Sequence, residues 1–163
     1  MNKFFYMKRN PEIDIDAIIK QARNLISGQG NRNEKLQEIC RLLEDQVDVF
    51  DWVGFYLVAE DEDRMLELGP YIGEETDHVR IPFGTGICGQ AAETLDTFVV
   101  QDVSKAGNYL ACSVDVKSEI VVPIMKGEQF VGELDIDSHT KGAITPELRR
   151  LCEEICRDLE QLF

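Results

Sequence analysis

The chain has 163 residues, and 44% of them are hydrophobic, which is typical of a globular protein and too apolar for a disordered one. Its 17 basic and 31 acidic residues give a formal net charge of −14 at pH 7. Because phosphate backbones and anionic lipids attract positive charge, this balance argues against nucleic acid and membrane surfaces as general partners. It favours small cationic or zwitterionic ligands instead.

Neither a membrane span nor a secretion signal is visible in the sequence. No stretch reaches the roughly 18 apolar residues that a membrane helix needs, and the apolar run at residues 4–7 is shorter than the core of a signal peptide. Five cysteines, an odd number without a C-x-x-C pair, argue against a disulfide framework or a zinc ribbon. We therefore expect a reducing, cytoplasmic compartment, and we predict neither a metal site nor a cofactor.

Three segments carry apolar residues at helical spacing: residues 11–27, 33–49 and 146–162. Gly28 follows the first segment as a stop signal. Thr145 and Pro146 suit the N-cap and the first position of the last helix.

Strands are predicted between the second and third helices, where β-branched and aromatic residues are frequent. The segments are residues 52–58, 65–68, 79–83, 98–101, 119–125 and 129–137. Residues 126–128 form a short turn between the last two, so these strands must be antiparallel. With no repeat or linker in view, we predict one α+β domain over residues 1–163, an antiparallel sheet with helices packed on it.

A glycine-rich stretch at residues 84–89 matches the G-x-G-x-x-G pattern of dinucleotide-binding loops. The segment before it contains Arg80 and Pro82, whereas the first strand of a dinucleotide fold is a continuous apolar run. The helix after it would span only residues 89–95, which is short for a parallel crossover. The glycines therefore favour a tight turn whose backbone N–H groups can hold an anion such as a carboxylate.

The five cysteines divide into two groups. Cys40, Cys152 and Cys156 lie on or beside the apolar stripes of predicted helices, which indicates buried core thiols. Cys88 and Cys112 lie in glycine-rich or polar loops, and Cys88 comes just before a predicted helix N-terminus, a position that lowers the pKa of a thiol. For these two, the residues alone leave a redox role and an inert one equally open.

Acidic residues alternate along the last predicted strand. Glu133, Asp135 and Asp137 share one face, with apolar residues between them on the other. Glu119, at the start of the neighbouring strand, can join them. A solvated sheet face is one interpretation, and a site that binds a cation is the other, because adjacent acids repel and are poor strand formers.

Trp52 and Tyr56 are four residues apart in the first predicted strand and so face the same side. They are either core aromatics or a hydrophobic wall for a ligand.

Seven stretches taken together resemble the free methionine-(R)-sulfoxide reductase family, a branch of GAF domains. They follow one another in order and, with the flanking helices, cover nearly the whole chain. They are residues 51–57 (DWVGFYL), 68–71 (LGPY), 80–92 (RIPFGTGICGQAA), 101–103 (QDV), 108–112 (NYLAC), 118–123 (SEIVVP) and 132–138 (GELDIDS).

The resemblance implies a GAF-like fold, a central antiparallel sheet of about six strands with N- and C-terminal helices packed on it. It also implies a closed pocket for free methionine sulfoxide, and a homodimer. The residues that match the substrate-binding positions of the family are Trp52, Tyr56, Glu119, Asp135 and Asp137.

The resemblance further implies a thiol cycle. Cys112 matches the nucleophile, which attacks the sulfoxide sulfur and becomes a sulfenic acid while a nearby acid, Glu119, supplies a proton. Cys88 matches a second redox cysteine, and a thioredoxin-type partner would reduce the resulting disulfide. Where the family commonly carries a third cysteine, this chain has His78, so either Cys88 or an external thiol is left to resolve the sulfenic acid.

Two other functions stay open from the sequence. One is a non-catalytic GAF module that binds a small ligand and signals, although such modules are usually joined to an output domain. The other is a weakly active family member that binds methionine sulfoxide but recycles poorly.

Overall fold

The computed structural model describes residues 12–107 and 114–163. In this part of the chain the α-helices are α1 (Ile15–Ser27), α2 (Arg32–Gln46), α3 (Gly86–Thr94) and α4 (Pro146–Asp158), with short 3-10 helices at Val103–Lys105 and Leu159–Leu162. No helix in these described ranges is long and apolar enough to cross a membrane.

Within the described residues, six strands form one antiparallel sheet, which confirms the predicted α+β class. The strands are β1 (Trp52–Val58), β2 (Met65–Ile72), β3 (Arg80–Pro82), β4 (Phe98–Val100), β5 (Ser118–Lys126) and β6 (Gln129–Ser138), in the order β3-β2-β1-β6-β5-β4. The predicted hairpin between β5 and β6 is present, and Gly127 adopts a positive φ of 60° in its turn, which glycine tolerates without strain.

Local sequence explains where the helices begin. Asp14 accepts a hydrogen bond from the Ala17 backbone N–H at 3.0 Å, so the first helix begins at Ile15, later than the predicted residue 11. Asn31 and Glu34 form a reciprocal capping box at the start of α2. Thr145 caps α4, as predicted, and Pro146 is its first residue.

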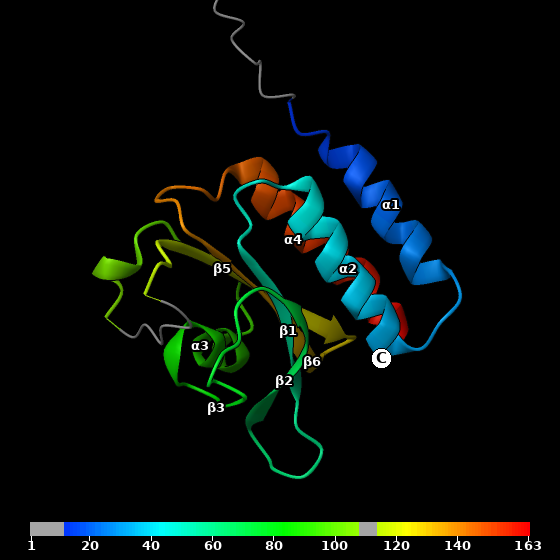
Figure 1. Cartoon of the computed structure of the whole chain (residues 1–163). Helices are drawn as coiled ribbons and strands as arrows, with labels where there is room; N and C mark the ends of the chain where they lie inside the picture. The colour runs from blue at the N-terminus through cyan, green and yellow to red at the C-terminus, as the bar shows by residue number, and fades with distance from the viewer. Residues whose placement is uncertain (1–11, 108–113) are drawn as a thin grey trace, which may run out of the picture.

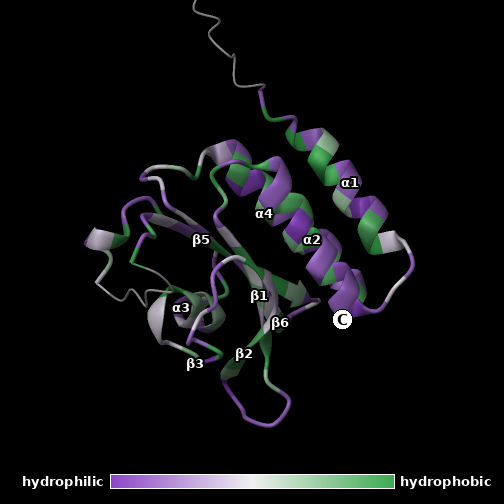
Figure 2. Ribbon diagram, in the orientation of Figure 1, coloured by the Kyte–Doolittle hydropathy of each residue, from purple (hydrophilic) through white to green (hydrophobic). Residues whose placement is uncertain are grey.

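One face of the sheet carries the larger hydrophobic core. Helices α2 and α4 pack directly on it, and α1 lies against both of them (Figure 1). From the sheet, Val53 and Phe55 of β1 and Leu134 and Ile136 of β6 point into this core. Hydrophobic and hydrophilic residues alternate around the helices, as expected for helices that bury one side (Figure 2).

The three helical cysteines belong to this core. Cys40, Cys152 and Cys156 are all buried among its apolar residues, as predicted from the helical stripes. Burial raises the pKa of each thiol, so these cysteines are not poised as nucleophiles.

The opposite face of the sheet is covered by α3 and by the segments around it (Figure 1). β3 and β4, which flank α3 in the sequence, lie at opposite edges of the antiparallel sheet. The glycine-rich stretch is therefore not part of a parallel βαβ unit, which agrees with the rejection of a dinucleotide loop. The short helix begins at Gly86, three residues earlier than predicted.

Candidate active site

Four carboxylates are buried between the sheet and its α3 side. Glu133, Asp135 and Asp137 of β6 are 0%, 0% and 1% exposed, and Glu119 of β5 is 4% exposed. Glu119 lies directly opposite Asp137 in the antiparallel ladder, so the two side chains project to the same face. The interpretation of these acids as a solvated sheet face is wrong, because α3 and its flanking segments exclude water from them.

The aromatic pair lies on the same face, one strand away. Trp52 and Tyr56 of β1 are paired with Asp137 and Glu133 of β6, and both rings are buried. The Trp52 ring stacks on Tyr56 at 6.4 Å and on Tyr71 at 5.4 Å between centroids. This face therefore places an aromatic surface beside an acidic one.

Hydrogen bonds at their polar ends hold both aromatic rings in place. The Trp52 Nε1–H donates to the Glu74 carbonyl at 3.0 Å. The Tyr56 hydroxyl donates to the His78 carbonyl at 2.8 Å. Both partners lie between β2 and β3, so this connection closes over the aromatic side of the site.

Gly54, which sequence reasoning missed, allows the Trp52 ring to lie across β1. A Cβ atom at position 54 would lie 2.3 Å from Cη2 of Trp52 and 2.8 Å from Cβ of Tyr71. These separations are far below van der Waals contact. A glycine between two aromatic residues inside a predicted strand was the available signal, because glycine there often marks a close approach.

The glycine-rich turn places Cys88 over the acids. Gly84 and Gly86 adopt positive φ values of 86° and 64°, and Thr85 is the N-cap of α3. Cys88 lies within the first turn of the helix, not before it, and is 6% exposed. Its Sγ lies 4.0 Å from Oε1 of Glu119, within the range of a weak thiol hydrogen bond.

Burial, reinforced by nearby acids, reverses the predicted shift in the pKa of the Cys88 thiol. Burial, and then the negative charges of Asp135 and Glu133, raise the pKa of the Cys88 thiol well above its ordinary value. The expected lowering by the helix N-terminus is therefore wrong, because desolvation and facing acids outweigh it. Burial also raises the pKa of Asp135, and burial together with the charge of Asp135 raises that of Glu133 well above its usual range.

Cys88, Glu119 and Asp135 lie around a cavity of about 10 Å³, the space of one water-sized particle. Its described lining is His78, Ile81, Thr85, Gly86, Ile87, Cys88, Glu119 and Asp135. The structure thus brings together Cys88, Glu119 and Asp135 from three separate elements, and adds His78 to them. The predicted nucleophile Cys112 lies outside the described residues.

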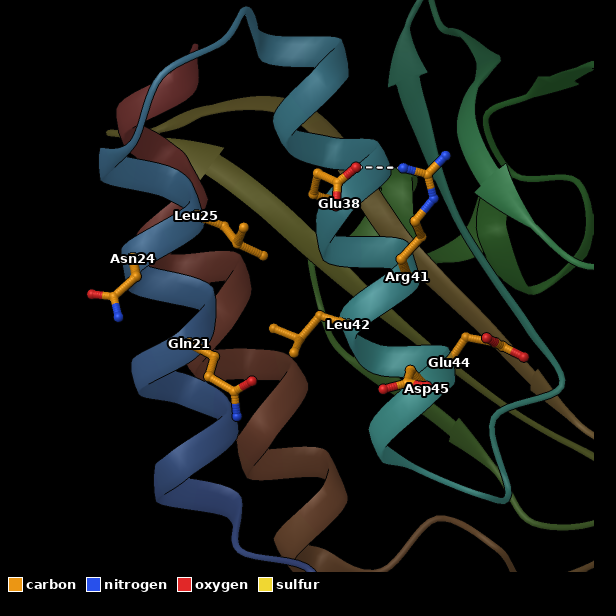
Figure 3. Close-up of a pocket in the computed structure, with 8 residues that line it drawn as sticks. All are labelled: Gln21, Asn24, Leu25, Glu38, Arg41, Leu42, Glu44 and Asp45. Atoms are coloured by element: carbon orange, nitrogen blue, oxygen red, sulfur yellow. Dashed lines mark hydrogen bonds and ion pairs between the residues drawn. The ribbon is translucent and has the colours of Figure 1, made fainter.

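A larger groove of about 600 Å³ lies elsewhere, between α1 and α2 (Figure 3). Figure 3 shows polar side chains such as Gln21 and Asn24 along it and an ion pair between Glu38 and Arg41. Most of its lining is exposed, and none of the predicted site residues reaches it. The small cavity against the acids is the better candidate, because buried polar groups converge there.

Comparisons with known proteins agree with this fold. Residues 31–163 match the GAF domain family. The free methionine-R-sulfoxide reductase of Saccharomyces cerevisiae is 37% identical over 160 residues, covering 90% of this chain and 88% of that protein. The Escherichia coli protein of the same name is 34% identical over 139 residues, covering 85% and 82%.

A solved structure extends the agreement to three dimensions. The free methionine-R-sulfoxide reductase from Neisseria meningitidis, in complex with its substrate, superposes with a TM-score of 0.86 at 32% identity, covering 91% of this chain and 87% of that one. The fold and the family match define a GAF domain. Within that class, the chain belongs to the free methionine-R-sulfoxide reductase family.

Replacing Gly54 with Ala is expected to displace the Trp52 ring, because the new methyl group would overlap it. We expect a loss of about 1–3 kcal/mol of unfolding free energy, as for other overpacked sites. Trp52 is the only tryptophan, so its fluorescence should shift to longer wavelength as the ring gains solvent. Gly107→Ala is the control, since Gly107 has open space around it. An unchanged spectrum in Gly54→Ala would contradict the packing described.

Replacing Glu133 with Gln is expected to weaken the dependence of stability on pH. A carboxyl whose folded pKa is raised binds its proton more tightly when folded, so its stabilising contribution is complete below the unfolded pKa of about 4.3 and is lost as pH rises toward the folded pKa. Each such group lowers the unfolding free energy by up to about 1.4 kcal/mol per pH unit within that window.

Urea unfolding of the parent protein and of Glu133→Gln between about pH 5 and pH 8 measures how the unfolding free energy changes with pH. The decline should be shallower in Glu133→Gln, with part of it left by Asp135. Glu128→Gln, at an exposed position, should follow the parent protein. Parallel curves for all three proteins would show that Glu133 does not hold its proton in the folded state.

Proposed function

We propose that this protein reduces free methionine-(R)-sulfoxide to methionine through a cysteine cycle. The observation that carries the proposal is the buried acidic cluster facing two aromatic rings, beside the Cys88 thiol, in a chain of this family. The related proteins from yeast and E. coli bear the name of this activity, and the N. meningitidis structure was solved with its substrate.

The acids account for selectivity toward the free amino acid. Asp135 and Asp137 would pair with the substrate ammonium group, Glu119 would contact its sulfoxide oxygen, and Trp52 and Tyr56 would contact its apolar side chain. A methionine sulfoxide within a peptide has no such ammonium group. It would leave buried carboxylates uncompensated, at a cost of several kcal/mol.

Substrate binding requires the cavity to widen. Its volume of about 10 Å³ suits one water-sized particle, and methionine sulfoxide is much larger. The side chains that line it must therefore move apart when the amino acid enters.

Cys112 would act first in the chemistry. Its thiolate attacks the sulfoxide sulfur, the S–O bond breaks, and the oxygen, carrying the proton from Glu119, remains on Cys112 as a sulfenic acid while methionine leaves. Glu119 would protonate the sulfoxide oxygen and so make its sulfur electrophilic.

Cys88 would then attack the Cys112 sulfenic acid, forming a disulfide and releasing water. Because the pKa of Cys88 is raised, this step needs a base, and Glu119 lies within 4.0 Å of its sulfur. Glu119, having given up a proton in the first step, is in the correct state to accept one in the second. A thioredoxin-type dithiol would reduce the disulfide and complete the cycle.

The proposal also includes a cytoplasmic location, a homodimer and one domain over residues 1–163. A reducing compartment suits the four described cysteines, all of which are free thiols. The dimer follows from the family resemblance.

Asp135→Asn is expected to lower kcat/KM for free methionine sulfoxide by roughly 10- to 150-fold, the effect of losing about 1.5–3 kcal/mol from a charge-assisted hydrogen bond. NADPH oxidation coupled through thioredoxin and its reductase measures the rate. Glu128→Gln, which changes an exposed acid, should retain the parent value. Turnover of a peptide substrate at the rate of the free amino acid would contradict recognition of the ammonium group.

The two cysteine roles predict different single-turnover behaviour. Cys112→Ser should release no methionine, because the first step cannot occur without its nucleophile. Cys88→Ser should release about one methionine per chain without reductant and then recycle slowly with thioredoxin. The opposite pattern would reverse the roles, and full cycling by both variants would exclude the cysteine mechanism. Substrate binding without turnover by the parent protein would favour a non-catalytic module.

A further inference from the structure

Three donor atoms of the acidic pocket have the spacing of metal ligands. Sγ of Cys88 and carboxylate oxygens of Glu119 and Asp135 all lie within 4.8 Å of one another. The three residues come from α3, β5 and β6, so no spacing in the sequence indicates the group. All three side chains are buried, unlike the exposed acids of the surface.

Asp135 supplies a separate indication that a cation belongs here. It is 0% exposed and lines the cavity, yet neither carboxylate oxygen accepts a hydrogen bond of ordinary geometry within residues 12–107 and 114–163, and the groups beside it include the acid Glu119 and the thiol Cys88. No lysine or arginine is among the described residues that line the cavity. A buried carboxylate without a partner is costly, and a cation is the partner that relieves this cost most directly.

The size and chemistry of the pocket select the ion. A cavity of about 10 Å³ suits one particle of the size of a water molecule. One sulfur and two carboxylate oxygens form a donor set that Zn²⁺ accepts, whereas Mg²⁺ and Ca²⁺ prefer oxygen ligands alone. Bond lengths of about 2.3 Å to sulfur and about 2.1 Å to oxygen would put tetrahedral ligand atoms about 3.4–3.6 Å apart. The three donor atoms would therefore move closer together when the ion binds.

We propose that Cys88, Glu119 and Asp135 form a binding site for a single Zn²⁺ ion, with the fourth position open to an exchangeable ligand. Cys88 binds as a thiolate, and its proton passes to solvent as the zinc–sulfur bond forms. No electron transfer accompanies the step. The open fourth position is the arrangement found in zinc sites that exchange ligands.

Zinc at this position would inhibit the proposed reductase. It would occupy the carboxylates assigned to the substrate and would block the sulfur assigned to resolve the sulfenic acid. The inhibition rests on the proposed function, whereas the binding does not.

Direct binding to the full, reduced, chelator-treated chain tests the site. Titration calorimetry should give one Zn²⁺ per chain, and Co²⁺ in its place should show the absorption band of a thiolate–metal bond. Cys88→Ser should abolish that band, and Asp135→Asn and Glu119→Gln should each weaken Zn²⁺ binding by at least tenfold. Glu128→Gln is the matched control and should bind like the parent protein. Circular dichroism checks that each variant is folded.

Several results would overturn the proposal. They are absence of the thiolate band in the parent protein, equal binding of Mg²⁺, or a band that persists in Cys88→Ser and disappears in Cys112→Ser. Activity is a separate readout: Zn²⁺ should inhibit turnover, and a chelator should restore it. Binding without inhibition would refute the overlap with the reductase site. If the protein has no reductase activity, the binding experiments alone still test the zinc site.

Discussion

The burial of acidic groups on one face of the sheet is the constraint on which the rest of the structure depends. Glu119, Glu133, Asp135 and Asp137 lie within a hydrophobic protein interior where ionised carboxylates are strongly disfavoured. The opposite face, with the larger apolar core under α2 and α4, supplies the stabilisation that offsets them. One face of the sheet therefore stabilises the fold, and the other can hold buried carboxylates that are costly on their own.

Strand register keeps the two faces distinct. In β6 the acids alternate with Leu134 and Ile136, so a slip of one residue would turn the carboxylates into the helical core. The tight turn at Gly127 fixes the pairing of β6 with β5. The same register sets Glu119 opposite Asp137, so the short hairpin turn helps to decide which acids meet in the site.

Helices, strands and the acidic face could be predicted because their signals are local: periodicity, caps and turn residues. Burial of that face could not, because its cover comes from α3, which is remote in sequence from β6. The pKa of Cys88 shows the same limit. Its helix N-terminus indicated a lowered value, but the acids that raise it lie on β5 and β6. Gly54 was overlooked because its role depends on how the Trp52 ring lies across the strand.

Raised carboxyl pKa values connect the stability of the pocket with its selectivity. Burial raises the pKa of Glu133 and Asp135, which favours their neutral forms and so limits the buried charge. A cationic group that enters favours the ionised carboxylates, which then release those protons and pair with it. A neutral group offers no such exchange. The same acids can thus be buried when protonated, and when ionised they would select positive charge, whether it is carried by an ammonium group or by a metal ion.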